Sequence, residues 1–141
     1  MQPKLTTYVL VFETGLASKC EVVEGCEADA FPKLTAHLGK FTPYKVDPSI
    51  FPATDNFRDA WTYKDGKIGH DMNTAREIHR NRLREARKEH LAALDVGFMR
   101  ALEAGQDTKA IVAEKARLRD ITSDPRIDAA KTVDELKCVW F

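Results

Sequence analysis

Residues 73–104 constrain the fold most, because their pattern predicts one long amphipathic helix. This stretch holds no proline, and its single glycine is Gly97. Its less polar positions recur at steps of four and three, which places them on one stripe; they are Ala75, His79, Leu83, Ala86, His90, Leu94, Phe98 and Ala101. At ~1.5 Å per residue the helix is roughly 48 Å long, whereas a compact domain of about 100 residues has a radius of gyration of ~13 Å. We therefore expect a returning helix of the same chain, or another chain, to cover the stripe.

The size and charge of the chain limit what it can be. Its 141 residues suffice for one ordinary domain, or for a small domain with a helical tail. Apolar residues make up 43% and charged residues 31%, which favours a folded core over disorder. The 22 basic and 22 acidic residues cancel, and this balance argues against a protein that holds nucleic acid mainly through phosphates.

The cysteines and the hydropathy pattern indicate a cytosolic protein. Cys20, Cys26 and Cys138 cannot form a closed disulfide set, and they show no zinc-knuckle or redox spacing. We interpret them as reduced thiols. No apolar run is long enough for a signal peptide or a membrane span. We therefore expect a soluble protein made in a cytosol.

The first half of the chain predicts a small β-rich domain with one short helix. Residues 5–12 are β-branched, aromatic and mostly apolar, and residues 19–23 alternate weakly, so the two predict a hairpin that turns around Gly15. Residues 27–38 suit a helix that Gly39 stops. Pro32 must then lie in the first turn of that helix, because a later proline breaks it.

A proline-rich connection and a second hairpin follow. Pro43, Pro48 and Pro52 leave room for at most one short strand, at residues 44–46. Asp-Gly at residues 65–66, between residues 60–63 and 67–70, is a strong hairpin signal. We place the domain boundary directly after it, which gives a β-rich domain over residues 1–71 and a helical part over residues 72–141.

The second half predicts a helical hairpin and short terminal helices. The long helix starts after Asp71 or Asn73 and stops at Gly105, while Gly97 costs up to ~1 kcal/mol and favours a bend or break. A second helix runs from residue 107 or 108 to residue 121 and forms an αα-hairpin with the first. Asp-Pro at residues 124–125 starts a further turn, and Thr-Val-Asp-Glu at residues 132–135 is a capping box. The predicted fold class is α+β, with more helix than the roughly one-third average of globular proteins.

No residue pattern predicts catalysis or metal binding. His79 and His90 share a helix face but lie roughly 16 Å apart along the axis, too far to share a metal. We interpret these two, with His37 and His70, as packing residues. The chain holds no HExxH pattern, glycine-rich phosphate loop, nucleophile elbow or kinase motif. We expect a protein that is not an enzyme and that carries no cofactor.

The basic part of the long helix allows three interpretations. It contains Arg76, Arg80, Arg82, Arg84, Arg87 and Lys88. Glu77 with Arg80 and Glu85 with Lys88 have the spacing of stabilising pairs, which favours a solvated helix face. The alternatives are a surface for an acidic partner and a phosphate-binding face, the latter typical of a nucleic-acid-binding regulator.

The aromatic residues are candidates either for a core or for a partner surface. Phe57, Trp61 and Tyr63 lie just before the long helix, and Trp140 and Phe141 end the sequence. Such residues pack a core, but Trp and Tyr are also enriched among residues that dominate interface energy. The candidate partner-binding residues are Trp61, Leu83, Leu94, Phe98, Trp140 and Phe141.

The apolar stripe also bears on self-association. Two alanines and two histidines dilute it, so it is weaker than a Leu/Ile zipper. The second helix spans only about half of the first. We therefore expect the N-terminal half, around Leu83, to be covered by the β-rich domain, a symmetry mate or a partner, and the isolated protein to be partly oligomeric.

Several segments of the second half carry a resemblance to known proteins. They are NFRDAW, DM-x-x-AREIHR-x-RLR, LAALDVGFMRALEAG and LRDIT-x-DP-x-IDAAKTVDELK-x-VW. In this order they resemble small tail-associated proteins of tailed bacteriophages, and the last also resembles the ends of phage tail-fibre assembly proteins. The resemblance covers about 85 of the 141 residues. It leaves out the first 55, and the chain ends in Trp-Phe where the pattern has Trp-Pro.

The resemblance implies a phage tail protein, either a structural component or a fibre-assembly factor that acts through protein–protein contacts. The implied partners are other phage tail proteins. The residue pattern itself adds further copies of the chain as a partner, predicts no contact with a membrane and argues against nucleic acid as a partner. The implied location is the virion tail, or the host cytoplasm during assembly. The family supplies no catalytic residues to transfer to this chain.

Overall fold

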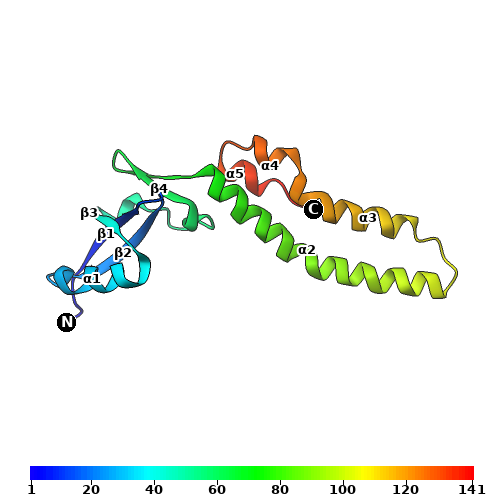
Figure 1. Ribbon diagram of the computed structural model, residues 1–141, viewed down its shortest axis with the longest axis horizontal. Coiled ribbons are helices and arrows are strands. Elements are labelled where there is room, and N and C mark those ends of the chain that lie inside the picture. The colour runs from blue at the N-terminus through cyan, green and yellow to red at the C-terminus, as the bar shows by residue number, and fades with distance from the viewer. The chain divides into compact units, whose positions relative to one another are not determined.

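The computed structural model describes all residues, 1–141, and confirms the predicted α+β class. The chain divides into two compact units, Met1–Ala75 and Arg76–Phe141. The strands lie in the first unit, and long antiparallel helices dominate the second (Figure 1).

A three-stranded antiparallel sheet forms the centre of the first unit. Its strands are β1 (Leu5–Phe12), β2 (Ala17–Val23) and β3 (Phe41–Lys45), in the order β2-β1-β3. The predicted β1–β2 hairpin is confirmed, with Leu5 opposite Val23 and Val11 opposite Ala17. The central position of β1 explains why it is the most apolar strand, since both of its faces are covered.

Strand β3 starts earlier than the proline pattern predicted. It runs from Phe41 and includes Pro43, whereas residues 44–46 were expected. The Val46 N–H donates to the Thr7 carbonyl at 3.0 Å, so alternate N–H groups of β3 point to β1. Pro43 lies three residues before Val46, so its nitrogen points away from β1, towards the open edge of the sheet. No hydrogen bond between strands is lost there.

Helix α1 (Glu27–Leu38) packs on one face of this sheet. The rings of Tyr8 and Phe31 meet edge to face with centroids 5.1 Å apart, and the Tyr8 hydroxyl donates to Glu27 at 3.0 Å. Gly39 ends the helix as predicted, with φ +86° and its N–H bonded to the Thr35 carbonyl.

The expectation for Pro32 was wrong. This proline is the sixth residue of α1, beyond the first turn, and the helix continues past it. The proline removes one hydrogen bond to the Ala28 carbonyl. Because Ala28 is exposed, water can bind that carbonyl instead, and the packed Phe31 ring keeps the helix on the sheet.

The segment after β3 covers the other face of the sheet and ends in the second hairpin. Its elements are η1 (Pro48–Ile50), η2 (Arg58–Ala60), β4 (Trp61–Lys64) and β5 (Lys67–His70). The predicted Asp-Gly turn is confirmed. Asp65 and Gly66 have φ values of 52° and 74°, the left-handed pair that a two-residue hairpin of this twist requires.

Helix α2 (Met72–Glu103) matches the predicted long helix closely. The Asp71 carboxylate accepts the Thr74 N–H at 3.0 Å and caps the helix. The helix continues without a break through Gly97, where an added Cβ would lie 4.0 Å from Ile111 Cδ1. At its end Gln106 N–H bonds to the Ala101 carbonyl and Gly105 N–H to the Leu102 carbonyl, which is a Schellman motif.

The chain then returns along α2 in a series of shorter helices. They are α3 (Lys109–Asp120), η3 (Ile121–Ser123), α4 (Pro125–Ala129) and α5 (Val133–Lys137). Asp124 caps α4 and Thr132 caps α5, as predicted. The capping box is shifted by one residue, because Glu135 accepts the N–H of Lys131 at 2.7 Å rather than that of Thr132.

The returning helices cover the whole length of α2, which corrects the expectation about its N-terminal half. Helix α3 lies beside the second half of α2, and α4 and α5 lie beside the first half (Figure 1). Leu83 is 0% exposed. It shares the second unit with buried apolar residues from every returning helix; these are Leu118, Ile121, Ile127, Leu136 and Val139. The same chain therefore supplies the cover that we had assigned to another domain or partner.

The burial of Leu83 predicts that its truncation destabilises the second unit. Leu83→Ala should lower the free energy of unfolding by about 2–5 kcal/mol, because it removes a fully buried side chain and leaves a cavity. Leu102→Ala is the matched control in the same helix; Leu102 is 52% exposed, so its loss should cost less than about 1 kcal/mol. Urea unfolding followed by circular dichroism at helical wavelengths measures both. Equal losses would contradict the assignment of Leu83 to the core.

Candidate functional site

A half-exposed aromatic pair forms the most distinctive surface of the second unit. The rings of Trp140 and Phe141 are stacked, with centroids 5.2 Å apart and planes 19° apart. Phe141 also meets the ring of His90, on α2, edge to face at 5.1 Å. Trp140 is 49% exposed. We call Trp140, Phe141 and His90 the aromatic patch.

The backbone directly before the aromatic patch is buried and hydrogen-bonded. The preceding residue, Val139, is buried, and its carbonyl oxygen lies 2.8 Å from Nε2 of the buried His79. A carbonyl can only accept, so Nε2 carries the proton and donates it. His79 is therefore more than the packing residue that the sequence predicted. Its hydrogen bond also holds the backbone directly before Trp140.

The arginines of α2 bind the returning chain instead of forming a solvated face alone. Arg76 donates to the Ala130 carbonyl at 2.8 Å, and Arg87 donates to the Arg119 carbonyl at 2.6 Å. Arg80 donates to the Thr122 carbonyl at 3.3 Å. The last carbonyls of a helix have no partner within it, and these guanidinium groups supply one.

The predicted ion pairs within α2 are also present. Arg80 pairs with Glu77 at 2.8 Å, and Lys88 pairs with Glu85 at 2.7 Å. Arg80 additionally bonds Asp128 of α4, and its hydrogen bonds to Asp128 and Glu77 raise the pKa of its guanidinium. The spacing correctly indicated the local pairs, but the bonds to α3 and α4 join residues too distant in sequence for spacing to find.

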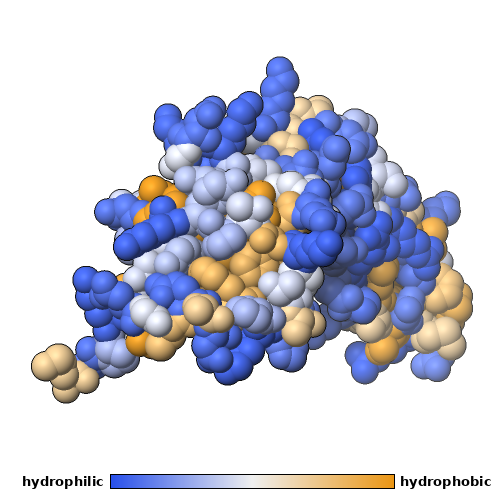
Figure 2. Space-filling view, turned by 60° about the vertical axis from the view of Figure 1, so that its left-hand side comes forward, coloured by the Kyte–Doolittle hydropathy of each residue, from blue (hydrophilic) through white to orange (hydrophobic).

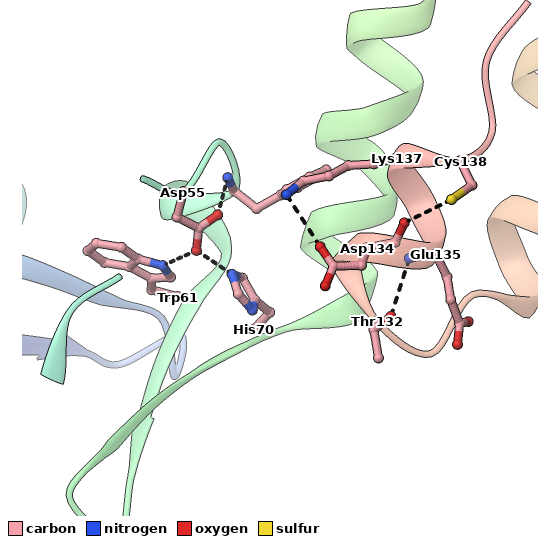
Figure 3. Close-up of polar contacts among 9 residues, drawn as sticks. Asp55, Trp61, His70, Thr132, Asp134, Glu135, Lys137 and Cys138 are labelled. Atoms are coloured by element: carbon pink, nitrogen blue, oxygen red, sulfur yellow. Dashed lines mark hydrogen bonds and ion pairs between the residues drawn. The ribbon is translucent and has the colours of Figure 1, made fainter. Parts of the chain in front are cut away.

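A buried carboxylate organises the loop before the second hairpin in the first unit. Asp55 accepts the Trp61 indole N–H at 2.7 Å and the Phe57 N–H at 2.7 Å, and its Oδ2 lies 2.6 Å from His70 Nε2 (Figure 3). Burial raises the pKa of Asp55, but these donors outweigh it and hold the pKa below its usual value. Trp61 belongs to β4 and His70 to β5, so Asp55 ties both strands to the loop.

The sequence prediction missed the role of Asp55. Asp55 stands among prolines and small residues, and no short motif distinguishes it. It lines a pocket of about 370 Å³ with Lys19, Phe51, Arg58 and Trp61. Because its two oxygens already accept three hydrogen bonds, its evident task there is to hold the loop.

The structure separates the six predicted partner-binding residues. Trp61, 4% exposed, lies in the core of the first unit, and Leu83, 0% exposed, lies in the core of the second, so neither side chain is accessible to a partner. Leu94 and Phe98 are partly buried within the helical hairpin. The Lys115 ammonium lies 5.4 Å from the centre of the Phe98 ring. Trp140 and Phe141 remain as candidate partner-binding residues, and their rings stack on each other.

Two further observations concern membranes and metals. No helix has both the length and the apolar character needed to cross a bilayer. No group of three or more His, Cys, Asp and Glu side chains is arranged to hold a metal ion.

Comparisons with protein-family models, with curated proteins and with solved structures found no match.

The Asp55 network predicts an acid-sensitive first unit. Asp55→Asn should lower the free energy of unfolding by about 1–3 kcal/mol at neutral pH, because the charge-assisted hydrogen bonds to Trp61 and His70 are lost. A carboxylate with a lowered pKa stabilises the fold above its unfolded pKa, and this contribution is lost as the pH falls through the folded pKa. The difference between the variant and the wild type should therefore disappear in strong acid.

Trp61 fluorescence in a Trp140→Phe background measures this difference by urea unfolding at neutral and acidic pH. The exposed Asp59 supplies the matched control, and Asp59→Asn should change stability by less than about 0.5 kcal/mol. A difference between Asp55→Asn and the wild type that does not depend on pH would contradict the stabilising role of the charged carboxylate.

Proposed function

We propose that the protein is a non-enzymatic component of a bacteriophage tail, or a factor in tail-fibre assembly, that acts through protein–protein contacts. The resemblance of the second half to phage tail-associated proteins supports this proposal. Most of the resembling segments fall in one folding unit: they supply most of α2, the turn at Gly105, the end of α3, and α4 with α5. The resemblance therefore coincides largely with one compact unit of the structure.

The aromatic patch is the observation that carries the proposal. A half-exposed Trp140, stacked on Phe141 and preceded by the buried Val139, is a large aromatic contact surface on an anchored backbone. Tryptophan is among the residues that contribute most to binding when they anchor an interface. Little conformational entropy is lost when a preorganised ring binds, which suits a protein whose task is to hold another.

The proposed partners are other phage tail proteins, and the proposed location is the virion tail or the host cytoplasm during assembly. The two locations separate a structural component from an assembly factor. A structural component remains in the finished particle, whereas an assembly factor is needed for tails to form but leaves them.

The alternative function, a nucleic-acid-binding regulator, requires basic side chains that are available for phosphates. Arg76, Arg80 and Arg87 instead donate to backbone carbonyls of the same chain. No specific observation favours the alternative, but saturable duplex binding at physiological salt would.

The proposal predicts that Trp140 is needed for the assembly of infectious particles. In a phage whose own copy of the gene is deleted, a plasmid-borne wild type should restore the titre, and Trp140→Ala should restore it at least about tenfold less, because truncation of an anchoring tryptophan weakens an interface strongly. Val112→Ala is the matched control, because Val112 is also half-exposed in the second unit, at 51%. Circular dichroism should show that both variants fold.

Electron microscopy and mass spectrometry of purified particles complete the test. Tails that lack fibres, with the protein absent from wild-type particles, indicate an assembly factor; the protein at fixed stoichiometry in wild-type particles indicates a structural component. A deletion that leaves tails and titre unchanged would refute both forms of the proposal.

A further inference from the structure

Helix α2 carries a second apolar stripe on its outer side. Ala92, Val96 and Met99 follow one another at steps of four and three, so they lie on one face. Val96 is 50% exposed and Met99 is 56% exposed. Gly97 faces Ile111 of α3, so the side of α2 that packs against α3 at this level is not the side that carries Val96. Apolar side chains reach the surface of the helical unit among hydrophilic ones, on the right of Figure 2.

We propose that this outer stripe binds the same stripe of a second copy of the chain, with the two α2 helices antiparallel. Such a dimer has twofold symmetry, so one surface serves both partners. With the axis near residues 95 and 96, Met99 of one copy lies opposite Ala92 of the other. A large side chain then meets a small one at two equivalent places, an arrangement that allows close packing.

The charges at the two ends of the stripe select the antiparallel arrangement. Lys88 and Glu89 precede the stripe, and Arg100 and Glu103 follow it; all four are exposed. In the antiparallel dimer Lys88 lies opposite Glu103 of the second copy, and Glu89 lies about 3 Å along the axis from the level of Arg100 of the second copy, within reach of its long side chain. Twofold symmetry repeats both pairs, which gives four opposite-charge contacts. A parallel alignment would instead place each of these residues against its own like charge.

The existing contacts of these residues do not oppose the dimer. Lys88 pairs with Glu85 within its own helix at 2.7 Å, but both side chains are exposed. An exposed pair of this kind contributes little, so Lys88 can exchange it or share it at small cost. Glu89, Arg100 and Glu103 have no ion-pair partner within the chain.

The interface is short, and the dimer should therefore be weak and concentration-dependent. Its apolar centre holds three side chains from each copy, and stable interfaces usually bury more than about 1,000 Å². This surface differs from the inner stripe that contains Leu83, which the protein already uses for its own core. The dimer does not depend on the proposed tail function, so either inference can fail alone.

Sedimentation equilibrium of the full chain, over a micromolar to high-micromolar range at low salt, tests the dimer. The wild type should show a reversible monomer–dimer equilibrium that weakens as salt rises. Val96→Asp should lower the association constant at least tenfold, because it would bury a carboxylate at the axis. The residue is half-exposed, and circular dichroism should show an unchanged fold.

Charge reversal tests the antiparallel pairing. Lys88→Glu and Glu103→Lys should each weaken the homodimer severalfold, since each creates two like-charge contacts. The double variant should regain the wild-type association, because Glu at position 88 then meets Lys at position 103 of the second copy. An equimolar mixture of the two single variants should also associate, as a heterodimer with restored pairs. Lys131→Glu changes an exposed charge outside the stripe and should have no effect.

Two results would overturn the proposal. One is a wild type that remains monomeric at high-micromolar concentration and low salt. The other is a pair of folded single variants whose defects neither the double variant nor the mixture repairs, since a parallel or unrelated contact would behave in this way.

Discussion

Helix α2 is stable only if its apolar stripe is buried by other parts of the chain. The need to bury this stripe determines the arrangement of the whole second unit. A helix of 32 residues is far longer than one returning helix of 12 residues can cover. The chain solves this by returning in stages: α3 covers the second half of α2, and α4, α5 and Val139 cover the first half. Arg76, Arg80 and Arg87 reach the backbone at the joints between these stages, so core packing and hydrogen bonding hold the same segments.

The elements that the sequence predicted best are those decided by neighbouring residues. The Asp-Gly turn, the stop at Gly39 and the caps at Asp124 and Thr132 each depend on the conformational preference of one or two residues. The period of α2 is equally local, because it follows from the repeat of a single helix. These features could be placed to within a few residues without knowing the fold.

The features that the sequence did not reveal depend on partners that are distant in the chain or on solvent exposure. The carbonyl that Arg76 binds is 54 residues away, and the one that His79 binds is 60 residues away. Asp55 gains its role only when Trp61 and His70 meet across the second hairpin. Pro32 and Pro43 are tolerated because α1 lies at the surface and β3 lies at the edge of the sheet, neither of which a propensity scale encodes. The sequence predicted two of the three residues of the aromatic patch, Trp140 and Phe141, as partner-binding residues, but it indicated only a packing role for His90 and for His79 beneath the patch.

Pro43 has a consequence for how copies or partners can attach to the first unit. An open sheet edge offers its N–H and C=O groups to any extended chain, and strand addition is a common route to both recognition and aggregation. At Pro43 the outer edge of β3 lacks a donor in the middle of a five-residue strand, which interrupts the ladder that an incoming strand would need. Growth of the sheet by β-augmentation is therefore disfavoured on this side, and recognition has to use side-chain shape and charge instead of the exposed backbone.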